Sequence, residues 1–286
     1  MTATSPPAGT LYVVATPIGN LEDITLRALR VLKEVALIAA EDTRTTRKLL
    51  SRYDIHTPLT SYHEHTPSAK EEELLDSLAR QNIALVTEAG MPGISDPGVR
   101  LIRSAVDRGY AVVPAPGPSA VTTAVAVSGL PADTFLYLGF LPRDAVERVT
   151  LLKSVALLPH TLVAFESPHR LRASLNDLAD VLDDRQIVLC RELTKVYEEV
   201  WRGTMSEALR HFEIVEPRGE FTLVIEGVVE EPPAPWTEAQ VRALLAERKA
   251  QGARAKETVK EVAELARWPK RDVYQLWIEL GNWPAG

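Results

Sequence analysis

The stretch IALVTEAGMPGISDPG, residues 83–98, constrains the fold of this chain more than any other feature. An apolar run that ends abruptly in several glycines and prolines is typical of a buried strand that opens into a loop with little side-chain cover. An apolar stripe begins again at Val99 and predicts a helix, with Asp96 as its N-cap and Pro97 in its first turn. The stretch therefore predicts a strand, a glycine-rich loop and a helix in succession.

The same succession is predicted at two other places. Each has a short apolar strand, a loop with proline and glycine, and an apolar helix, at residues 11–15, 16–20 and 24–32, and at residues 110–113, 114–120 and 121–128. Ligands of open α/β sheets bind outside the carboxyl ends of the strands, where such loops meet. Three loops of this kind predict a ligand-binding crevice. The alternative, that they only turn the chain, explains one such loop better than three.

The residues of these loops restrict the class of ligand. The phosphate-binding patterns GxxxxGK[ST] and GxGxxG are both missing from the sequence, and the loop of residues 87–98 carries Glu88 and Asp96 but no lysine or arginine. A polyphosphate ligand is therefore disfavoured, and a molecule with a positive centre and polar ends is favoured.

Alternating strands and helices continue through residues 11–129 and predict a first α/β domain with a parallel sheet. Its other predicted elements are a strand, a basic helix and a helix that opens with acids, at residues 35–40, 43–53 and 69–80. Gly129-Leu130-Pro131 marks the boundary to a second α/β domain, residues 130–230. Its strands are predicted at residues 135–139, 161–165, 187–190 and 219–225, and its helices at residues 147–157, 170–182 and 205–212. With fewer glycine loops, it is interpreted as the substrate side or a lid.

The two ends of the chain differ from these domains. Residues 1–10 are rich in proline, serine and threonine and predict a disordered lead-in, and residues 231–236 contain three prolines that predict a stiff linker. Residues 237–286 predict a helical, helix-turn-helix-like module, with Thr237 as the first cap and further helices at residues 255–266 and 270–280. The alternative for this module is packing on the body or on a partner subunit.

Charge and composition restrict the function classes further. The chain has 32 basic and 39 acidic residues, a formal net charge of −7, which by itself argues against a nucleic-acid partner. From Trp236 onward, however, nine basic and seven acidic residues give +2 and leave −9 for the rest. A mildly basic tail on an acidic body is a weak electrostatic footprint for phosphates. No apolar run approaches the roughly 20 residues of a membrane helix, so we expect a cytoplasmic protein without a membrane partner.

Cysteine and histidine give little sign of a disulfide or a metal. The single cysteine, Cys190, lies in an apolar run and is expected in the core. His63 and His65 lie two residues apart without further ligands nearby, so no metal site is expected.

Charged residues follow three of the predicted strands. In Glu41-Asp42-Thr43-Arg44, Asp42 or Thr43 is interpreted as a helix N-cap, and Arg44 shares a helical face with Arg47 that can meet phosphate. FESPHR at residues 165–170 and RELTK at residues 191–195 also place both charge signs at a strand end. These residues are either caps and solvated charges, or they face the cleft.

Eight motifs, in order along the chain, resemble those of a known family. They are ATPIGNLEDIT, AEDTR, SYHEH, TEAGMPGISDPG, PGPSA, FESPHR, CRELTK and the residues around Val273 and Tyr274. Over nearly the whole chain they resemble the bacterial ribosomal small-subunit cytidine 2′-O-methyltransferases of the tetrapyrrole-methylase superfamily. Small-molecule members of that superfamily carry Gly-Asp-Pro where this chain has TEAG, residues 87–90, which fits a different substrate.

The resemblance implies a fold, a cofactor and a reaction. The fold is two α/β domains of the class III methyltransferase type, with S-adenosylmethionine between them, in a homodimer. The reaction is methyl transfer to the ribose 2′-hydroxyl of a decoding-site cytidine, position 1402, in 16S rRNA or the assembled small ribosomal subunit.

Within this resemblance, the cofactor is expected at loop and strand-end residues of both domains, namely Pro17, Thr87, Ala89, Gly90, Ile94, Ser95, Ser119, Ala120, Phe165 and Thr222. A ribose hydroxyl is a poor nucleophile while it is protonated, so a general base is also expected. The candidates, all at strand ends, are Glu88, Glu192 and Lys195.

The RNA is expected at side chains that carry or can carry positive charge, namely Arg44, Arg47, His169, Arg170, Arg191, Lys256, Lys260, Lys270 and Arg271. Two other function classes fit parts of the sequence. A small-molecule, tetrapyrrole-type methyltransferase would use the same crevice but gives the basic tail no purpose. A non-catalytic RNA-binding ribosome-assembly protein would explain the tail but would not require a cofactor.

Overall fold

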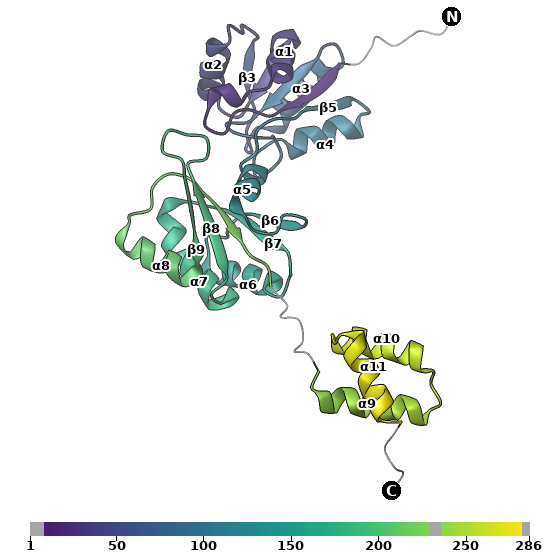
Figure 1. The fold of residues 1–286 in the computed structure, drawn as a ribbon. Coiled ribbons are helices and arrows are strands. Elements are labelled where there is room, and N and C mark those ends of the chain that lie inside the picture. Colours follow the sequence, from purple (N-terminus) through teal and green to yellow (C-terminus); the bar gives the residue numbers. More distant parts are fainter. Residues whose placement is uncertain (1–8, 229–235, 282–286) are drawn as a thin grey trace, which may run out of the picture. The chain divides into compact units, whose positions relative to one another are not determined.

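The computed structural model describes residues 9–228 and 236–281, and the chain divides into two compact units (Figure 1). The first unit, Met1–Val229, is here called the body, and the second, Glu230–Gly286, the module. The predicted lead-in and linker lie almost wholly outside the described residues. The body contains two five-stranded sheets flanked by helices, which confirms the predicted α/β class. In the described part of the chain, no helix combines the length and apolarity needed to cross a lipid bilayer.

The first sheet is parallel throughout, as the sequence predicted. Its strands run in the order β3-β2-β4-β1-β5, with bounds β1 (Thr10–Val14), β2 (Leu37–Ala40), β3 (Leu59–Ser61), β4 (Ile83–Val86) and β5 (Ala111–Ala115). All four residues of β4 are buried, because a central strand of a parallel sheet is covered on both faces. β3 was not predicted, since its three residues, LTS, form no apolar run.

Helices cover both faces of this first sheet. They are η1 (Leu21–Asp23), α1 (Leu26–Glu34), α2 (Thr43–Arg52), α3 (Ser68–Leu78) and α4 (Val99–Asp107). α1 and α2 pack on one face, where Leu32 and Leu49 contact strand residues such as Ile38. α3 and α4 pack on the opposite face through Leu75 and Leu101. The alternation of strand side chains between the two faces is what builds two cores around a single sheet.

The start of α4 differs from the prediction. Gly98, not Asp96, is the N-cap, with a φ of 136° that a residue with a side chain rarely adopts. A Cβ at this glycine would lie 2.9 Å from Cδ2 of Leu85, so close packing also requires glycine here. The predicted cap at Asp96 is wrong because two residues separate it from Val99, the first helical residue. The Asp96 carboxylate is therefore free to take another role.

The second sheet is mixed. Its strands run in the order β6-β7-β10-β8-β9, with bounds β6 (Phe135–Phe140), β7 (Thr161–Glu166), β8 (Gln186–Arg191), β9 (Glu199–Thr204) and β10 (Phe221–Ile225). β6 and β7 are parallel, and β10 and β9 run antiparallel to their neighbours. β9 was not predicted, because its half-exposed sequence EVWRGT has no apolar run.

The helices of the second sheet are α5 (Ala120–Ser128), α6 (Ala145–Val155), α7 (Pro168–Leu182) and α8 (Met205–Ile214). α6, α7 and α8 share one core with one face of the sheet. α5 packs on the other face, where Val121 and Val125 join Val163, Val188 and Val224. α5 lies within residues 11–129, the predicted first domain, yet its apolar side chains belong to the core of the second sheet. This helix therefore ties the two halves of the body together.

The module consists of α9 (Glu238–Ala250), α10 (Ala255–Ala266) and α11 (Lys270–Glu279). The predicted cap at Thr237 is confirmed: its side chain accepts the backbone N–H of Gln240, and the Gln240 side chain accepts the N–H of Thr237. A separate apolar core holds the three helices, with Val241, Val262 and Val273 among its buried residues. The module therefore has the core expected of a small independent helical unit.

Candidate functional site

The three loops rich in proline and glycine meet at the carboxyl ends of three adjacent strands, β4, β1 and β5. Thr16, after β1, donates its backbone N–H to the carbonyl of Gly90, after β4, at 2.9 Å, and accepts the Gly90 N–H at 3.0 Å. Gly117, after β5, lies so close to β1 that a Cβ would approach that of Ala15 to 3.1 Å. The predicted convergence of the three loops is therefore confirmed, and a glycine allows it.

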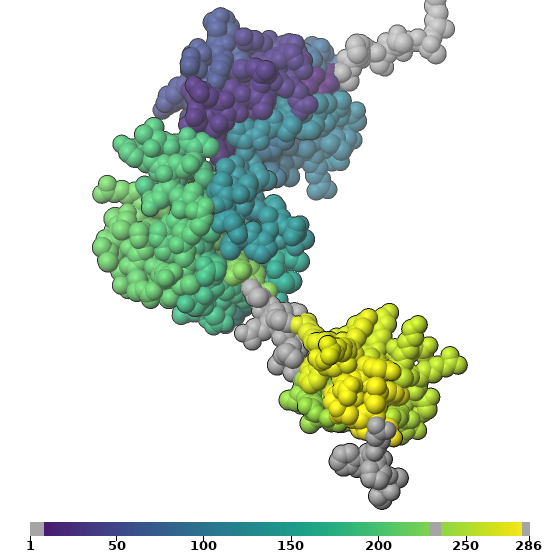
Figure 2. All heavy atoms as spheres, in the orientation of Figure 1, coloured from purple at the N-terminus to yellow at the C-terminus, as the bar shows by residue number. Residues whose placement is uncertain are grey.

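Strand ends and loops of the second half close the site. The hydroxyls of Ser95, in the loop before α4, and Tyr137, in β6, share a hydrogen bond of 2.6 Å. The backbone N–H of Asn20 donates to Oγ1 of Thr194 at 3.0 Å. A Cβ on Gly19 would lie 2.5 Å from Cγ of Lys195, so the loop after β1 needs glycine to approach this loop. The atoms of the two halves accordingly meet in the space-filling view (Figure 2).

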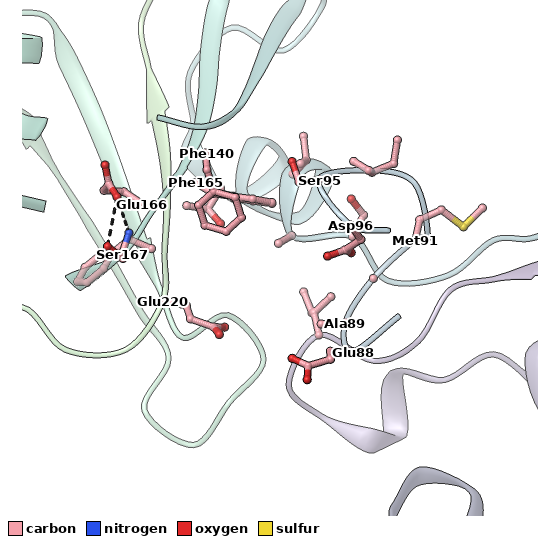
Figure 3. A pocket seen from close by; sticks show the side chains of 18 of the residues that line it. Glu88, Ala89, Met91, Ser95, Asp96, Phe140, Phe165, Glu166, Ser167 and Glu220 are labelled. Atoms are coloured by element: carbon pink, nitrogen blue, oxygen red, sulfur yellow. Dashed lines mark hydrogen bonds between the residues drawn. The ribbon is translucent and has the colours of Figure 1, made fainter. Parts of the chain in front are cut away.

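A cavity of about 410 Å³, here called the main cavity, lies between these loops and strand ends (Figure 3). Its volume is typical of small-molecule sites, which measure roughly 300–1,000 Å³. Eight of the ten predicted cofactor residues line it, namely Ala89, Gly90, Ile94, Ser95, Ser119, Ala120, Phe165 and Thr222. Pro17 and Thr87 line an adjoining cavity of about 240 Å³, which shares Glu88 and Glu220 with the main cavity. The structure thus brings all ten to one region.

One wall of the main cavity is aromatic. The ring of Phe165 meets those of Tyr137 and Phe140 edge to face, each at a centroid distance of 5.3 Å. Phe140 remains 56% exposed although it is a large apolar side chain. In Figure 3, Phe140 and Phe165 lie on the opposite side of the cavity from Glu88 and Asp96. An aromatic pair across from carboxylates, with Phe140 exposed and Phe165 half-buried, offers both apolar contact and cation–π attraction to a positive ligand.

The main cavity is acidic. Its lining includes the carboxylates of Glu41, Glu88, Asp96, Glu166 and Glu220, and none of the described residues that line it is lysine, arginine or histidine. Burial, together with the charges of Glu41 and Asp42, raises the pKa of Glu88. Burial, followed by the charge of Glu41, raises the pKa of Asp96 to about 7. A positive ligand would stabilise these carboxylates in their ionised form.

Thr87 supplies a further sign of a ligand. Its side chain is 1% exposed, and its hydroxyl finds no hydrogen-bond partner among the described residues. An unpaired buried hydroxyl costs about 1–3 kcal/mol, which a polar ligand atom would recover. The N-cap side chain of α5, Ser119, also makes no capping bond to the described backbone, which leaves the first N–H groups of that helix for a ligand. These residues fit S-adenosylmethionine, which has a positive sulfonium and polar ends.

The three predicted catalytic residues differ in their surroundings. Glu88 lines the main cavity. Nζ of Lys195 donates to Glu192 at 2.9 Å and to Glu220 at 2.8 Å, and these bonds outweigh burial and raise the pKa of Lys195. For Glu192, burial is outweighed by the bonds from Lys195 and from the Glu220 N–H, which lower its pKa. A lysine that holds its proton this firmly is a poor base, and Glu192 is not among the described residues that line either cavity.

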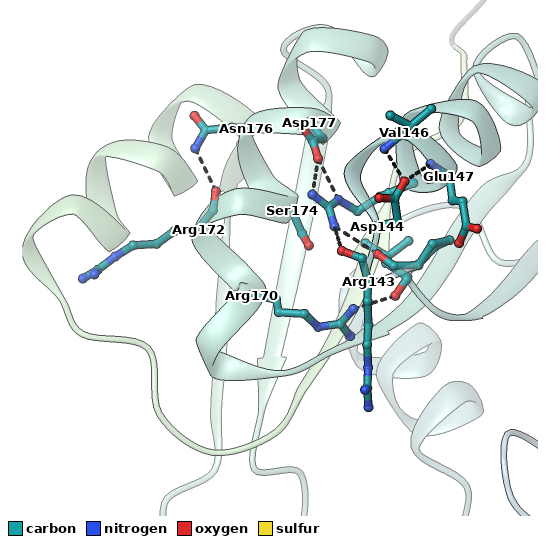
Figure 4. Close-up of polar contacts among 12 residues, drawn as sticks. Arg143, Asp144, Val146, Glu147, Arg170, Arg172, Ser174, Asn176 and Asp177 are labelled. Carbon is teal, nitrogen blue, oxygen red and sulfur yellow. Dashed lines mark hydrogen bonds and ion pairs between the residues drawn. The ribbon is translucent and has the colours of Figure 1, made fainter.

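Two predicted RNA-binding residues are engaged inside the protein. Arg170 forms an ion pair of 2.6 Å with buried Glu166 and donates to the carbonyl of Leu141 at 2.8 Å. Figure 4 shows Arg170 beside the contacts that hold α6 to α7. Arg191 donates to Glu199 of the neighbouring strand at 2.9 Å. Both guanidinium groups therefore stabilise the second half, whatever they contribute to RNA.

The remaining predicted RNA-binding side chains are exposed, namely Arg44, Arg47, His169, Lys256, Lys260, Lys270 and Arg271. None of them forms an ion pair with a described residue, in contrast to Arg170 and Arg191. Arg44 and Arg47 lie in the first turns of α2, whose N-cap is Asp42. The structure brings these two together on the body and places the four lysine and arginine residues of the tail on the module.

His63 and His65 are exposed at the start of the loop before α3. Within residues 9–228 and 236–281, histidine, cysteine and carboxylate side chains form no group of three or more that could hold a metal ion.

Several lining residues of the main cavity were not predicted as site residues, among them Asp96, Phe140 and Glu220. Asp96 had been assigned to the cap of α4. Phe140 follows Gly139, which has a φ of 70°, and the pairing of β6 with β7 shifts register between Tyr137 and Phe140. Such a bulge re-aims a side chain, and a glycine inside a strand is the sequence signal that marks it.

Comparison with known proteins gives a family and a fold. The family model "Tetrapyrrole (Corrin/Porphyrin) Methylases" matches residues 10–209. The chain is 48% identical over 273 residues to "Ribosomal RNA small subunit methyltransferase I" from Halalkalibacterium halodurans. This match covers 94% of each chain. It is also 48% identical over 220 residues to the protein of the same name from Thermotoga maritima. That match covers 77% of this chain and 99% of the relative.

Among solved structures, the uroporphyrin-III-C-methyltransferase from Thermus thermophilus is similar, with a TM-score of 0.53 and 22% sequence identity. The match covers 76% of this chain and 94% of that one. This likeness shows a shared fold.

Proposed function

The chain belongs to the tetrapyrrole methylase family, among the ribosomal RNA small subunit methyltransferases I, and we propose that it transfers a methyl group from S-adenosylmethionine to the ribose 2′-hydroxyl of the decoding-site cytidine of 16S rRNA. The enzyme class follows from the family. The cofactor site, the 2′-hydroxyl and the cytidine are the parts that the proposal adds.

The observation that carries the proposal is the chemistry of the main cavity. Carboxylates of Glu88, Asp96 and Glu220 and the rings of Phe140 and Phe165 surround a space of about 410 Å³ without a lysine or arginine among its described lining residues. Such a lining repels phosphates and favours a cation with an apolar surround. A sulfonium ion matches this requirement, and a nucleotide triphosphate does not.

S-adenosylmethionine, when bound, supplies a methyl group that is already activated by a positive sulfur. The chain then has to hold and orient the reactants. The Thr87 hydroxyl and the N–H groups at the start of α5 bind polar ends of the cofactor, while Phe140 and Phe165 cover its apolar surface and exclude water. Holding the acceptor oxygen in line with the methyl carbon and the sulfur contributes up to roughly 7–11 kcal/mol to lowering the barrier.

RNA is held by the exposed cations that have no ion pair within the described residues, namely Arg44, Arg47, Lys256, Lys260, Lys270 and Arg271. His169, exposed at the start of α7, adds to them when it is protonated. Arg170 and Arg191 act mainly by holding the strand ends in place. The substrate is 16S rRNA, naked or in the assembled small subunit, which places the enzyme in the cytoplasm. The active form is a homodimer, which light scattering of the full chain tests.

The decisive experiment combines cofactor binding with methyl transfer. We expect calorimetry to show binding of S-adenosylmethionine to the full chain. We expect labelled methyl groups to appear on 16S rRNA or small subunits, and nuclease digestion to recover them as 2′-O-methylcytidine. Transfer to a tetrapyrrole but not to RNA would establish a small-molecule methyltransferase instead. RNA binding without cofactor binding would establish an assembly protein.

A further inference from the structure

A second space adjoins the main cavity. It measures about 570 Å³ and is here called the acceptor cavity; Tyr62, Val99 and Arg100 are among the residues that line it. It shares Glu41, Ser95 and Asp96 with the main cavity. Groups bound in the two spaces would therefore both lie next to these three residues.

Asp96 differs from several other shielded carboxylates of the body. Glu71 is paired with Arg100, Glu166 with Arg170, and Glu192 with Lys195. Asp96 is half-buried and forms no ion pair with any described residue. A carboxylate that is shielded from water and left without a cation is costly unless a ligand or a proton compensates for it.

The carboxylates that face Asp96 favour its protonated form, and the nearby Thr87 hydroxyl opposes them. These carboxylates are Glu41, after β2, and Glu88, after β4; the neutral phenol of Tyr137 also approaches, from β6. Arg100, which lines the same acceptor cavity, is held by Glu71. These surroundings, with burial as the largest cause, put the pKa of Asp96 at about 7, where a carboxylate exchanges a proton readily at neutral pH.

We propose that Asp96 is the general base of the reaction and that the acceptor nucleoside reaches it through the acceptor cavity. The proposal rests on the function proposed above. Glu88 lines the main cavity and the smaller cavity beside it but is not among the described residues of the acceptor cavity. Glu41 lines both spaces, yet its Oε2 already accepts the backbone N–H of Glu88 at 3.2 Å. Asp96 therefore remains as the carboxylate that lines both the main cavity and the acceptor cavity.

The step is balanced without a further reactant. The ionised carboxylate of Asp96 accepts the proton of the ribose hydroxyl while the hydroxyl oxygen forms a bond to the methyl carbon. The carbon–sulfur bond breaks, and its electron pair stays on sulfur. Asp96 is then neutral and returns the proton to water through the acceptor cavity, ready for the next turnover.

The test is methyl transfer to small subunits, or to naked rRNA if that is the better substrate, across pH 5.5–9 and with S-adenosylmethionine well below saturation, so that the rate reports the ionisation of the free enzyme. We expect the wild-type rate to rise with pH and to level off above an inflection near 7, as Asp96 ionises. Asp96→Asn should lower the plateau by about 10²–10⁴-fold and remove this inflection. Asp96→Glu should restore part of the rate together with a pH inflection.

Asp107→Asn is the matched control, because it makes the same chemical change at the exposed C-terminal end of α4, and it should leave the rate and its pH profile unchanged. Calorimetry should show that Asp96→Asn still binds S-adenosylmethionine. A variant Asp96→Asn that keeps the wild-type rate or the inflection near 7 would overturn the assignment. Loss of the inflection in Glu88→Gln alone would also overturn it, in favour of Glu88.

Access through the acceptor cavity is tested separately. Val99 is 60% exposed and lines this cavity. Val99→Trp should raise the KM for RNA at least tenfold and leave the affinity for S-adenosylmethionine unchanged. An unchanged KM would show that the nucleoside enters elsewhere. If the wild type transfers no methyl group to any rRNA substrate, the proposed function itself falls; if it does and Asp96→Asn is equally active, only this inference falls.

Discussion

The two halves of the body differ in the carboxylates that follow their strands. At the strand ends of the second sheet, Glu166 and Glu192 are paired with Arg170 and Lys195. In the loops of the first sheet, Glu88 and Asp96 form no ion pair with any described residue, and both have raised pKa values. A paired carboxylate is fixed in its charge and serves the structure, whereas an unpaired one is ready to respond to a ligand or a proton. The carboxylates of the second half thus keep a fixed charge, whereas Glu88 and Asp96 of the first half can change their protonation when a ligand binds.

The largest effect should come from breaking a pair in the second half. Arg170→Ala leaves the fully buried carboxylate of Glu166 without its cation and should lower the free energy of unfolding by about 3–5 kcal/mol. Urea denaturation of the full chain, followed by far-ultraviolet circular dichroism, measures the loss. Arg30→Ala, which removes an exposed pair within α1, is the control and should cost less than about 1 kcal/mol. Similar losses for both variants would contradict the contrast between the halves.

The pH dependence of stability should have opposite signs at the two kinds of carboxylate. Asp96 binds its proton more tightly in the folded than in the unfolded chain, so its contribution to stability declines as the pH rises from about 4 to 7. Glu192 has a lowered pKa, so its contribution is present above the ordinary glutamate pKa and is lost as the pH falls below it. The slope for one group is at most about 1.4 kcal/mol per pH unit.

Thermal unfolding of Asp96→Asn and Glu192→Gln, compared with the wild type between pH 3 and 8, measures these slopes. Asp96→Asn should gain stability relative to the wild type towards pH 8, and Glu192→Gln should lose it towards neutral pH. If the stability of both variants, relative to the wild type, changed with pH in the same direction, the proposed difference between the two carboxylates would be wrong.

A smaller effect, about 1 kcal/mol, is expected at Thr87. Thr87→Val removes an unpaired buried hydroxyl at nearly constant volume. It should stabilise the free protein by about this amount, because no hydrogen bond compensates for the loss of water around the buried hydroxyl. The same change should weaken S-adenosylmethionine binding by about tenfold, if the hydroxyl bonds the cofactor. Thr222→Val, at a threonine of the neighbouring main cavity, shows whether any threonine in this region behaves alike. Lower stability of the free Thr87→Val protein would mean that its hydroxyl is already satisfied.

The smallest effect should be on the salt dependence of RNA binding by the module. Removing Lys270 and Arg271 together should reduce the slope of log affinity against log salt by about 1.4–1.8, because each phosphate contact contributes roughly 0.7–0.9. Filter binding of rRNA at several salt concentrations measures the slope. Arg242→Ala removes a cation of the same module that is already paired with Glu238 and Glu279, so it should leave the slope unchanged. An unchanged slope in the double variant would show that Lys270 and Arg271 do not contact phosphate.

A shortened chain tests the same question, because the body and the module are separate compact units. We expect a chain ending at Val229 to bind S-adenosylmethionine as the full chain does, with weaker RNA binding.

Much of the fold was predictable because its signals are local. Apolar runs that end in loops with glycine and proline predicted β1, β4 and β5, and Thr237 predicted the start of α9. The short or half-polar strands β3 and β9 were missed, since pairing with a neighbouring strand defines them rather than their own composition. The attachment of α5 to the second sheet was equally invisible, because an all-round apolar helix carries no mark of which sheet it will cover.

By itself, the sequence indicated the family, most of the strands and helices in their order, and the acidic, glycine-rich loops from which a site for a positive ligand follows. Only the tertiary structure decided which charged side chains form ion pairs with one another. Lys195 meets Glu192 and Glu220, Arg170 meets Glu166, and Asp96 is left without a cation among the described residues. The reason is physical: the protonation and reactivity of a carboxylate depend on the charges within a few ångströms of it, and those neighbours come from distant parts of the chain.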